Sequence, residues 1–291
     1  MKKRVVIDFD NTMGIKGCDI DDALALFTLL GNSERAELVG ITTAYGNSTI
    51  ENVNNATNWL VEKLGLNIPV HHGASCPDEP VSEAAEYLAK IAAENPGEIH
   101  LLVTGSTTNL KGAAIVDKNF FSNLASITAM GGIRESLYFN GNVCNELNLS
   151  CDPEASLEML QAPCPVSIAV SQNCLPALFN CKKFREHMSS YTWLVEACSS
   201  WFDTMEHTYG MDFFVGWDMT AALYLVKPEM FEDNIERVTL NKRLLSVGYL
   251  EPAHEDWPHA KINFPKIKDK DAFVAEIYRS MKAALDNCAN N

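Results

Sequence analysis

The sequence predicts an α/β protein built on an open, mostly parallel sheet flanked by helices. Two observations support this prediction: short apolar segments alternate with helical patterns, and polar clusters directly follow several of the apolar segments. Strands that alternate with helices at this spacing form right-handed crossovers, so neighbouring strands run parallel. Ligands bind beyond the carboxyl ends of the strands in such sheets, so the polar clusters mark the candidate site.

The first strand is expected at residues 5–7, Val-Val-Ile, and residues 21–30 are expected to form the first helix. The helix is predicted because Ala23, Phe27 and Leu30 repeat at helical spacing. The later strands of this alternating part are expected at residues 38–43, 68–70, 99–103, 127–130 and 166–170, and its later helices at residues 49–64, 82–94, 108–116 and 153–160.

The C-terminal third has a less regular pattern. Long helices are expected at residues 192–207 and 218–226, a hairpin or strands at residues 235–250, and a closing helix from Asp271. Neither a linker nor a low-complexity tract nor an internal repeat interrupts the chain. We therefore expect residues 1–291 to form a single domain, within the size range of large α/β units.

Composition and charge exclude several classes of function. The 38 acidic residues outnumber the 23 basic ones, which gives a net charge of −15, and this field repels nucleic acid and anionic membranes. The nine cysteines are odd in number and contain no Cys-x-x-Cys pair, which favours reduced thiols over a disulfide framework. The basic start, Met1 to Arg4, precedes only three apolar residues, too few for a signal peptide. A cytoplasmic protein without a nucleic-acid or membrane partner is expected.

Five carboxylates lie within fifteen residues near the start of the chain, beginning where the first strand ends. They are Asp8, Asp10, Asp19, Asp21 and Asp22. Carboxylates crowded in this way repel one another unless a cation neutralises them, and calcium accepts six to eight oxygen ligands. Capping of the helix near residue 22 would account for one or two of the acids, but not for the pair at the strand end. The cluster therefore predicts a metal or catalytic site.

Two local resemblances compete for the strand-end acids. The run Val5-Val6-Ile7-Asp8-Phe-Asp10-Asn-Thr12 resembles the first motif of haloacid-dehalogenase-type phosphatases, which implies a nucleophile at Asp8 and an acid at Asp10. Those enzymes also need a distal acidic pair, and the chain has no convincing one. An EF-hand loop fails because the position that requires glycine is Met13.

A third resemblance covers residues 4 to about 225, in order and in spacing. The chain carries Thr42-Thr43-Ala-Tyr-Gly46-Asn47, Thr104-Gly105-Ser-Thr-Thr-Asn109, Met130-Gly131-Gly132, Gly141-Asn142-Val-Cys-Asn-Glu146-Leu-Asn148, Asp152-Pro153-Glu154-Ala155 and Trp217-Asp218. With the N-terminal aspartates, this series is similar to that of the inosine–uridine-type nucleoside hydrolases. The resemblance implies that family's fold, a bound calcium ion, hydrolysis of the N-glycosidic bond of a ribonucleoside, and a homo-oligomer, dimer or tetramer.

The resemblance also implies a role for each matching residue. Asp10 would bind calcium and accept a proton from the attacking water, and the remaining protein ligands of calcium would be Asp22, the Thr104 backbone carbonyl and Asp218. The ribose hydroxyls would be held by Asp21, Asn47, Asn142, Glu146 and Asn148. A non-catalytic protein that binds a nucleoside or a cation, with a decayed site, is the alternative.

The chain departs from the family pattern at three places. Residues 11–18 are an insertion where the family has a tight Pro-Gly turn, which leaves Asp19 as a rival for one role. The interval from Asn142 to Glu146 is two residues shorter than usual. Trp217 stands where many members have a histidine, and Trp217-Asp218 resembles the purine-preferring (inosine–adenosine–guanosine) branch. This predicts an indole that stacks on the base, and purine nucleosides as the favoured substrates in a purine salvage role.

Overall fold

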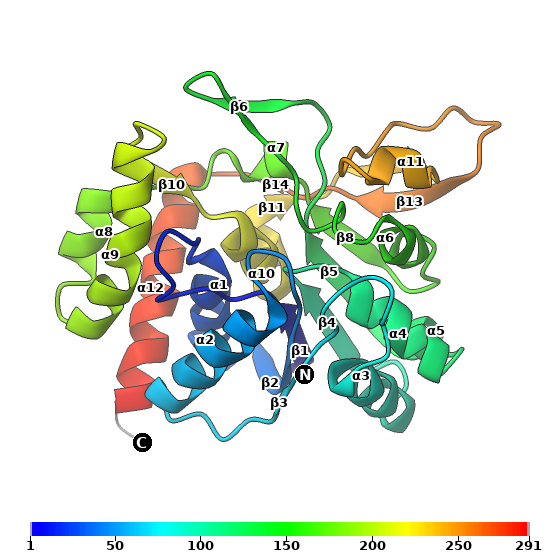
Figure 1. The fold of residues 1–291 in the computed structure, drawn as a ribbon, viewed down its shortest axis with the longest axis horizontal. Helices are drawn as coiled ribbons and strands as arrows, with labels where there is room; N and C mark the ends of the chain where they lie inside the picture. The colour runs from blue at the N-terminus through cyan, green and yellow to red at the C-terminus, as the bar shows by residue number, and fades with distance from the viewer. Residues whose placement is uncertain (1, 290–291) are drawn as a thin grey trace.

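The computed structural model describes residues 2–289 and centres on one eight-stranded sheet (Figure 1). From one edge to the other, the strands are β12 (Ile235–Thr239), β13 (His259–Asn263), β8 (Val166–Ala169), β5 (Leu124–Met130), β4 (Ile99–Val103), β1 (Lys3–Phe9), β2 (Ala36–Thr43) and β3 (Val70–His71). Neighbouring strands are parallel except β12, which runs antiparallel to β13. The predicted α/β class with a mostly parallel sheet is confirmed.

Helices cover both faces of the sheet. Successive side chains of a central strand therefore point into two different hydrophobic cores. Val5 and Ile7 of β1 belong to the larger core, whereas Val6 belongs to the smaller one. The larger core also takes apolar residues from α1 (Asp21–Leu30), α2 (Ile50–Lys63), α7 (Ser171–Cys174), α8 (Cys181–His187), α9 (Thr192–His207), α10 (Trp217–Val226) and α12 (Lys270–Ala289). The smaller core takes them from α3 (Glu83–Glu94), α4 (Thr108–Val116), α5 (Phe120–Asn123), α6 (Pro153–Leu160) and α11 (Lys242–Leu245).

Three pairs of short antiparallel strands lie outside the main sheet. They are β6 (Leu137–Phe139) with β7 (Asn142–Cys144), β9 (Leu178–Asn180) with β10 (Phe213–Val215), and β11 (Phe231–Glu232) with β14 (Lys266–Ile267), the last beside the 3₁₀ turn η1 (Pro228–Met230). The β6–β7 hairpin lies above the carboxyl ends of the strands, at the top of the view (Figure 1). It follows β5 in the chain and therefore starts at the edge where the polar clusters are expected.

Most sequence-predicted elements are confirmed, and α1, α4, α6 and α9 have the predicted bounds. Two expectations are confirmed only in part. The strand predicted at residues 68–70 is β3, which begins at Val70, and the hairpin or strands predicted at residues 235–250 amount to one strand, β12, without a hairpin. The segment contains β12, which pairs with β13, and then α11. The Asn241 side chain caps α11 by accepting a hydrogen bond of 3.0 Å from the Arg243 backbone N–H. The pairing partner of β12 lies beyond the segment, so local pattern did not reveal it.

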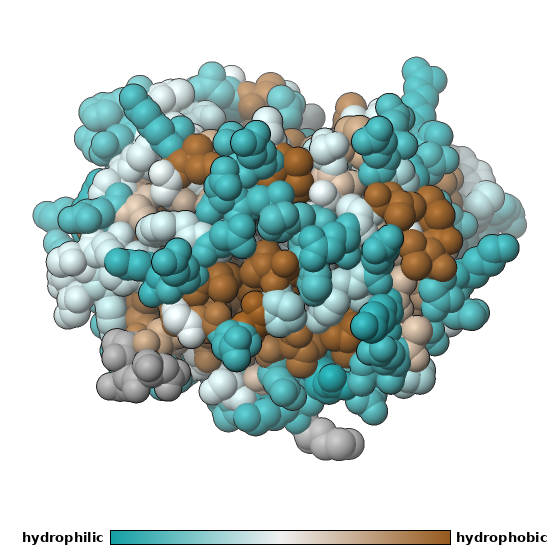
Figure 2. Space-filling model, turned by 60° about the horizontal axis from the view of Figure 1, so that its bottom comes forward, coloured by the Kyte–Doolittle hydropathy of each residue, from teal (hydrophilic) through white to brown (hydrophobic). Residues whose placement is uncertain are grey.

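The surface mixes hydrophilic and apolar side chains. On the face turned forward in Figure 2, apolar patches are divided by hydrophilic groups. Large exposed apolar side chains, such as Trp59, Ile115 and Trp257, come from segments far apart in the chain. Within residues 2–289, no helix combines the length and the apolar character needed to cross a membrane.

Candidate functional site

The candidate site forms where three adjacent strands end. Asp8 near the end of β1 pairs in register with Thr42 of β2 and with Val103 of β4, so Asp10, Asn47 and Thr104 follow strands that end at the same edge. The backbone confirms this convergence, because the Thr104 N–H donates to the Asp8 carbonyl at 2.8 Å. The strand order β4–β1–β2 thus brings together motifs that lie about 100 residues apart in the sequence.

Three aspartates meet beside this edge at the first turns of two helices. Asp21 and Asp22 open α1, Asp218 lies in the first turn of α10, and one carboxylate oxygen of each lies within 4.8 Å of the others. The Asp218 backbone N–H donates to Asp21 Oδ2 at 3.1 Å, which joins the two helix starts. Helix N-termini favour negative charge through their free N–H groups and dipoles, so both helices stabilise the acids there.

Asp10 lies next to this trio and is held by Asn47. The Asn47 backbone N–H donates to Asp10 Oδ2 at 2.6 Å, and Asn47 Nδ2 donates to Asp10 Oδ1 at 3.0 Å. On the other side, Asp22 Oδ1 accepts from Thr104 Oγ1 at 2.7 Å. Gly46 makes the close approach possible, because a Cβ at this residue, whose φ is +159°, would lie 2.0 Å from Asp10 Oδ2.

All four carboxylates are buried, and their pKa values reflect both burial and crowding. Burial raises the pKa of Asp10 and of Asp21 to about 6. Burial, followed by the charges of neighbouring aspartates, raises the pKa of Asp22 and of Asp218 well above the ordinary range. Among the described residues, none of the four forms a salt bridge with a basic side chain. The cluster therefore lacks a positive charge from the protein itself.

This donor set fits a hard divalent cation. The cluster offers carboxylate oxygens from Asp10, Asp22 and Asp218 and the nearby Thr104 carbonyl, with Asp21 as a further carboxylate. Oxygen-only donors of this kind suit calcium or magnesium, and the absence of thiolate or imidazole donors disfavours softer metals. A cation would also offset both causes of the raised aspartate pKa values, which are burial and then the repulsion between neighbouring carboxylates.

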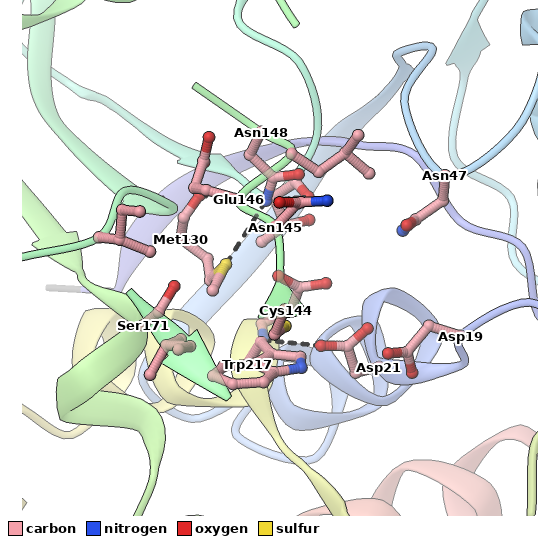
Figure 3. A pocket seen from close by; sticks show the side chains of 15 residues that line it. Asp19, Asp21, Asn47, Met130, Cys144, Asn145, Glu146, Asn148, Ser171 and Trp217 are labelled. Carbon is pink, nitrogen blue, oxygen red and sulfur yellow. Dashed lines mark hydrogen bonds between the residues drawn. The ribbon is translucent and has the colours of Figure 1, made fainter. Parts of the chain in front are cut away.

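A cavity of about 210 Å³ opens beside the carboxylates. Asp19, Asp21 and Asn47 lie on one side of it and Met130 and Ser171 on the other (Figure 3). The remaining lining residues are Thr104, Ile133, Leu137, Cys144, Asn145, Glu146, Leu147, Asn148, Trp217 and Asp218. The cavity therefore combines an edge of buried carboxylates, several polar side chains and one indole.

Two of the predicted sugar-binding residues are rigidly held in the cavity wall. The Glu146 carboxylate accepts backbone N–H groups from Gly132 at 3.0 Å, Leu149 at 2.8 Å and Ser150 at 2.9 Å, although burial still raises its pKa. Asn148 donates both amide hydrogens, to the Thr104 carbonyl at 3.0 Å and to the Met130 carbonyl at 3.2 Å. Its side-chain oxygen therefore remains as the acceptor that a hydroxyl group could use.

A second cavity, of about 300 Å³, adjoins the first and shares four lining residues with it: Asp19, Cys144, Asn145 and Trp217. Its other walls are largely aromatic or apolar and comprise Phe139, Asn142, Val143, Trp201, Met205, Tyr209, Met211 and Val215. Trp217 thus stands between a polar compartment and an aromatic one, and Phe139 contacts it edge-to-face with ring centroids 6.2 Å apart.

Two neighbouring asparagines, Asn142 and Asn145, occupy different places relative to the two cavities. Asn142, predicted to bind the sugar, lines only the second cavity, whereas Asn145 lines both cavities and its amide lies among the polar groups of the first (Figure 3). One feature of the sequence could have indicated Asn145: the interval from Asn142 to Glu146 is two residues shorter than usual in the family, which makes the match at Asn142 uncertain in position. Asp19, left open by the sequence, also lines both cavities.

Asp8 lies below the site and outside both cavity linings. It is fully buried, and its Oδ1 accepts from Thr42 Oγ1 at 2.6 Å and from Asn109 Nδ2 at 2.8 Å. Burial raises its pKa to about 7. A carboxylate enclosed in this way cannot attack a phosphate ester in solution, which argues against the phosphatase alternative.

Comparisons with known proteins agree on one family. A family model described as inosine-uridine preferring nucleoside hydrolase matches residues 5–275. A probable uridine nucleosidase 2 from Oryza sativa subsp. japonica is 26% identical over 266 residues, which cover 79% of this chain and 76% of the relative. In fold, the chain is similar to a plant nucleoside hydrolase (TM-score 0.83, 20% identity, 97% of this chain and 99% of the other). It is also similar to a purine-preferring ribonucleoside hydrolase from Gardnerella vaginalis (TM-score 0.82, 19% identity, 98% and 100%).

Proposed function

The chain belongs to the inosine-uridine preferring nucleoside hydrolase family, and from this premise we propose that it cleaves the N-glycosidic bond of purine ribonucleosides with water. One observation supports the proposal above the others. A buried aspartate cluster without basic partners borders a 210 Å³ cavity that also holds amide, carboxylate and indole groups. Such a cavity can bind a cation, a polyhydroxylated sugar and an aromatic ring side by side.

We propose calcium as the cation, with Asp10, Asp22, the Thr104 carbonyl and Asp218 as its protein ligands. Bound there, calcium would orient a water molecule and lower its pKa. Asp21 offers a further carboxylate within the same 4.8 Å group, so its oxygens are available either to the cation or to a ribose hydroxyl.

In the proposed mechanism, Asp10 is the general base. Without a cation, burial raises the pKa of Asp10 to about 6. A bound cation would favour the ionised form, so Asp10 would meet the water as a carboxylate that can accept a proton. Asn47 fixes the carboxylate with two hydrogen bonds, so its orientation does not depend on substrate. The attacking water loses its proton to Asp10 as its oxygen bonds to C1′ and the C1′–N bond breaks, and the departing base takes a proton from solvent.

Polar groups around the sugar would stabilise the positive charge that develops on the ribose in an oxocarbenium-like transition state. Glu146 and the Asn148 oxygen can accept hydrogen bonds from ribose hydroxyls, since both are held by the backbone in the cavity wall. Asp21 and Asn47 complete the proposed set. We assign the remaining amide to Asn145 instead of Asn142, because Asn145 lines the carboxylate cavity.

The preference for purines rests on Trp217. Its indole lies between the two cavities, where it can stack on a base whose sugar occupies the first cavity. Stacking on a nucleobase contributes about 1–3 kcal/mol, and a purine offers the larger surface. Named relatives include both uridine nucleosidases and a purine-preferring hydrolase, so substrate preference varies among similar proteins.

A panel of ribonucleosides tests the proposal directly. The wild-type protein with calcium should release reducing sugar from inosine, adenosine or guanosine faster than from uridine. Asp10→Asn should lower turnover by several orders of magnitude, whereas Asp8→Asn should cost less because Asp8 lies outside both cavities. Release of phosphate from p-nitrophenyl phosphate, lost on Asp8→Asn, would favour the phosphatase alternative. Tight nucleoside binding without sugar release would favour a binding protein.

Three wider expectations remain predictions: a cytoplasmic location with a purine salvage role, a dimeric or tetrameric assembly, and a single domain. The last is consistent with the packing of the C-terminal α12 against the N-terminal α1. Analytical ultracentrifugation at several protein concentrations measures the assembly.

A further inference from the structure

The second cavity has two walls that come from distant parts of the chain. One wall is the β6–β7 hairpin with the residues after it, which contribute Phe139 and residues 142–145. The other is α9 with the loop and strand that follow, which contribute Trp201, Tyr209 and Val215. The cavity therefore exists only while the hairpin stays against the α9–β10 segment.

Few interactions hold the hairpin in that place. Each strand has three residues, and the side chains of Tyr138 and Val143 are mostly exposed, at 62% and 56%. An isolated two-stranded hairpin is marginally stable in water, so its position depends on what it contacts. On the inner side, the Phe139 ring contacts Trp217.

The turn of the hairpin makes the direct connection to the opposite wall. Asn140 Nδ2 donates to the Tyr209 carbonyl at 2.7 Å and to the Gly210 carbonyl at 3.1 Å. Asn140 has φ of +49°, a left-handed conformation that asparagine and glycine adopt most readily. Gly210 has φ of +63°, a left-handed conformation that glycine adopts without strain and that orients its carbonyl toward the Asn140 amide.

We propose that Asn140 is a positioning residue for substrate binding: its side chain fastens the β6–β7 hairpin to the α9–β10 loop and so closes the aromatic compartment that receives the nucleobase. The inference rests on the proposed function for the nature of the ligand. Asn140 lines neither cavity, so it acts through the hairpin and not by contact with substrate.

The location of Asn140 predicts a specific kinetic signature. Release of the hairpin disturbs Phe139 and residues 142–145, which line the aromatic compartment, while Asp10 and the metal-binding aspartates belong to other elements. Loss of the fastening therefore weakens binding of the base in ground state and transition state alike, which raises KM and leaves kcat nearly unchanged. D-ribose, which has no base, should lose less affinity than inosine, because within the hairpin segment Asn145 is the residue proposed to contact the sugar.

Two substitutions at Asn140 remove the hydrogen bonds in different ways. Asn140→Gly removes the side chain but tolerates the positive φ, and Asn140→Asp keeps the shape while placing a carboxylate against two carbonyl oxygens. For each variant we expect a KM for inosine about tenfold higher, which corresponds to about 1.4 kcal/mol, with kcat within about twofold and a smaller change in the inhibition constant for D-ribose than in the KM for inosine. Tyr138→Ala, on the exposed side of the same hairpin and outside both cavities, is the matched control and should behave as wild type.

Hydrogen exchange of residues 137–144 separates this inference from the proposed function. Faster exchange in both Asn140 variants, but not in Tyr138→Ala, is expected whether or not the protein hydrolyses nucleosides. If the wild-type protein hydrolyses no ribonucleoside, the proposed function is overturned. Hydrogen exchange would still show whether the Asn140 hydrogen bonds hold the hairpin in place. Unchanged exchange in both variants, or an unchanged KM for a nucleoside that the wild type hydrolyses, would overturn the role of Asn140.

Discussion

Removal of calcium should make the stability of this protein depend steeply on pH, because four buried aspartates share one cluster. Burial raises the pKa of Asp10 and of Asp21 from 3.8 to about 6, so the folded protein holds protons that the unfolded chain has already released. A raised carboxyl pKa contributes stability that is full below the unfolded pKa and is lost as pH rises through the folded pKa. Without a cation, the free energy of unfolding should therefore fall between about pH 4 and pH 7.

The size of the effect follows from the two pKa values near 6. A pKa raised from 3.8 to about 6, at 1.36 kcal/mol per pH unit, gives about 3 kcal/mol for Asp10. The charges of Asp10 and Asp21 interact, so their two contributions do not simply add. For a chain of this size, about 2 °C per kcal/mol converts the Asp10 contribution to a midpoint difference of about 6 °C. A saturating concentration of calcium offsets this loss of unfolding free energy, because calcium binds the aspartates in their deprotonated form.

Thermal melting from pH 4.5 to pH 8, with calcium or with chelator, measures this difference. The two midpoints should nearly coincide at pH 4.5 and separate as pH rises. Asp22→Asn removes one charge from the cluster, so with chelator at pH 7 it should be more stable than wild type and should gain little from calcium. Asp256→Asn, an exposed residue, is the matched control. Midpoints that coincide with and without calcium at every pH, for a protein free of calcium by elemental analysis, would refute the reasoning.

Three substitutions in the cavity have distinct expected outcomes. Trp217→Ala should lower turnover of purine nucleosides roughly 10- to 100-fold, about 1.4 kcal/mol per tenfold, while calcium affinity, measured by titration calorimetry, changes little. An unchanged inosine-to-uridine ratio at matched folded fraction would exclude the stacking role. Gly248→Ala should lower activity strongly, because Gly248 has φ of +67° and its Cβ would lie 2.1 Å from Glu146 Oε2; wild-type kcat in a folded variant would contradict a sugar-binding role for Glu146. Asn145→Ala should weaken D-ribose inhibition about tenfold, the expected loss for one hydrogen-bonding group, whereas Asn142→Ala should not, and the reverse order would restore the assignment made from sequence.

Sequence pattern was sufficient for the parts of the fold whose signal is local. The strand before Asp8 is a short β-branched run, and the α1 segment carries Ala23, Phe27 and Leu30 at helical spacing, so both could be predicted from a few residues. The partner of β12 could not, since β13 lies twenty residues or more away and pairing depends on the completed sheet. The β6–β7 hairpin was also missed, because three-residue strands carry too little period to be recognised.

The same limit applies to the site. The carboxylates of Asp10, Asp21 and Asp22 were evident because they are close in sequence, and Asp218 was found only through the order of the motifs. Choosing between Asn142 and Asn145 required the hairpin register. In the structure, Asn142 pairs with Phe139 at the second cavity, and Asn145 follows the last paired residue of β7. The direction of each side chain was therefore set by tertiary packing that the interval between motifs does not encode.

The hydrogen bonds of Asn148 connect the proposed sugar site to the proposed cation site, which predicts that the two ligands bind cooperatively. Its amide nitrogen holds the Thr104 carbonyl, a proposed calcium ligand, while its oxygen is the group available to the sugar. A sugar hydroxyl that donates a hydrogen bond to the Asn148 oxygen polarises the amide. This changes the strength of the hydrogen bond from the amide nitrogen to the Thr104 carbonyl. Linkage requires reciprocity: whatever factor calcium adds to nucleoside affinity, the nucleoside must add to calcium affinity. Substitution of Asn148 should therefore lower the calcium affinity and the nucleoside affinity, and it should also reduce the factor by which each ligand strengthens binding of the other. Titration of one ligand at several fixed concentrations of the other measures all three quantities.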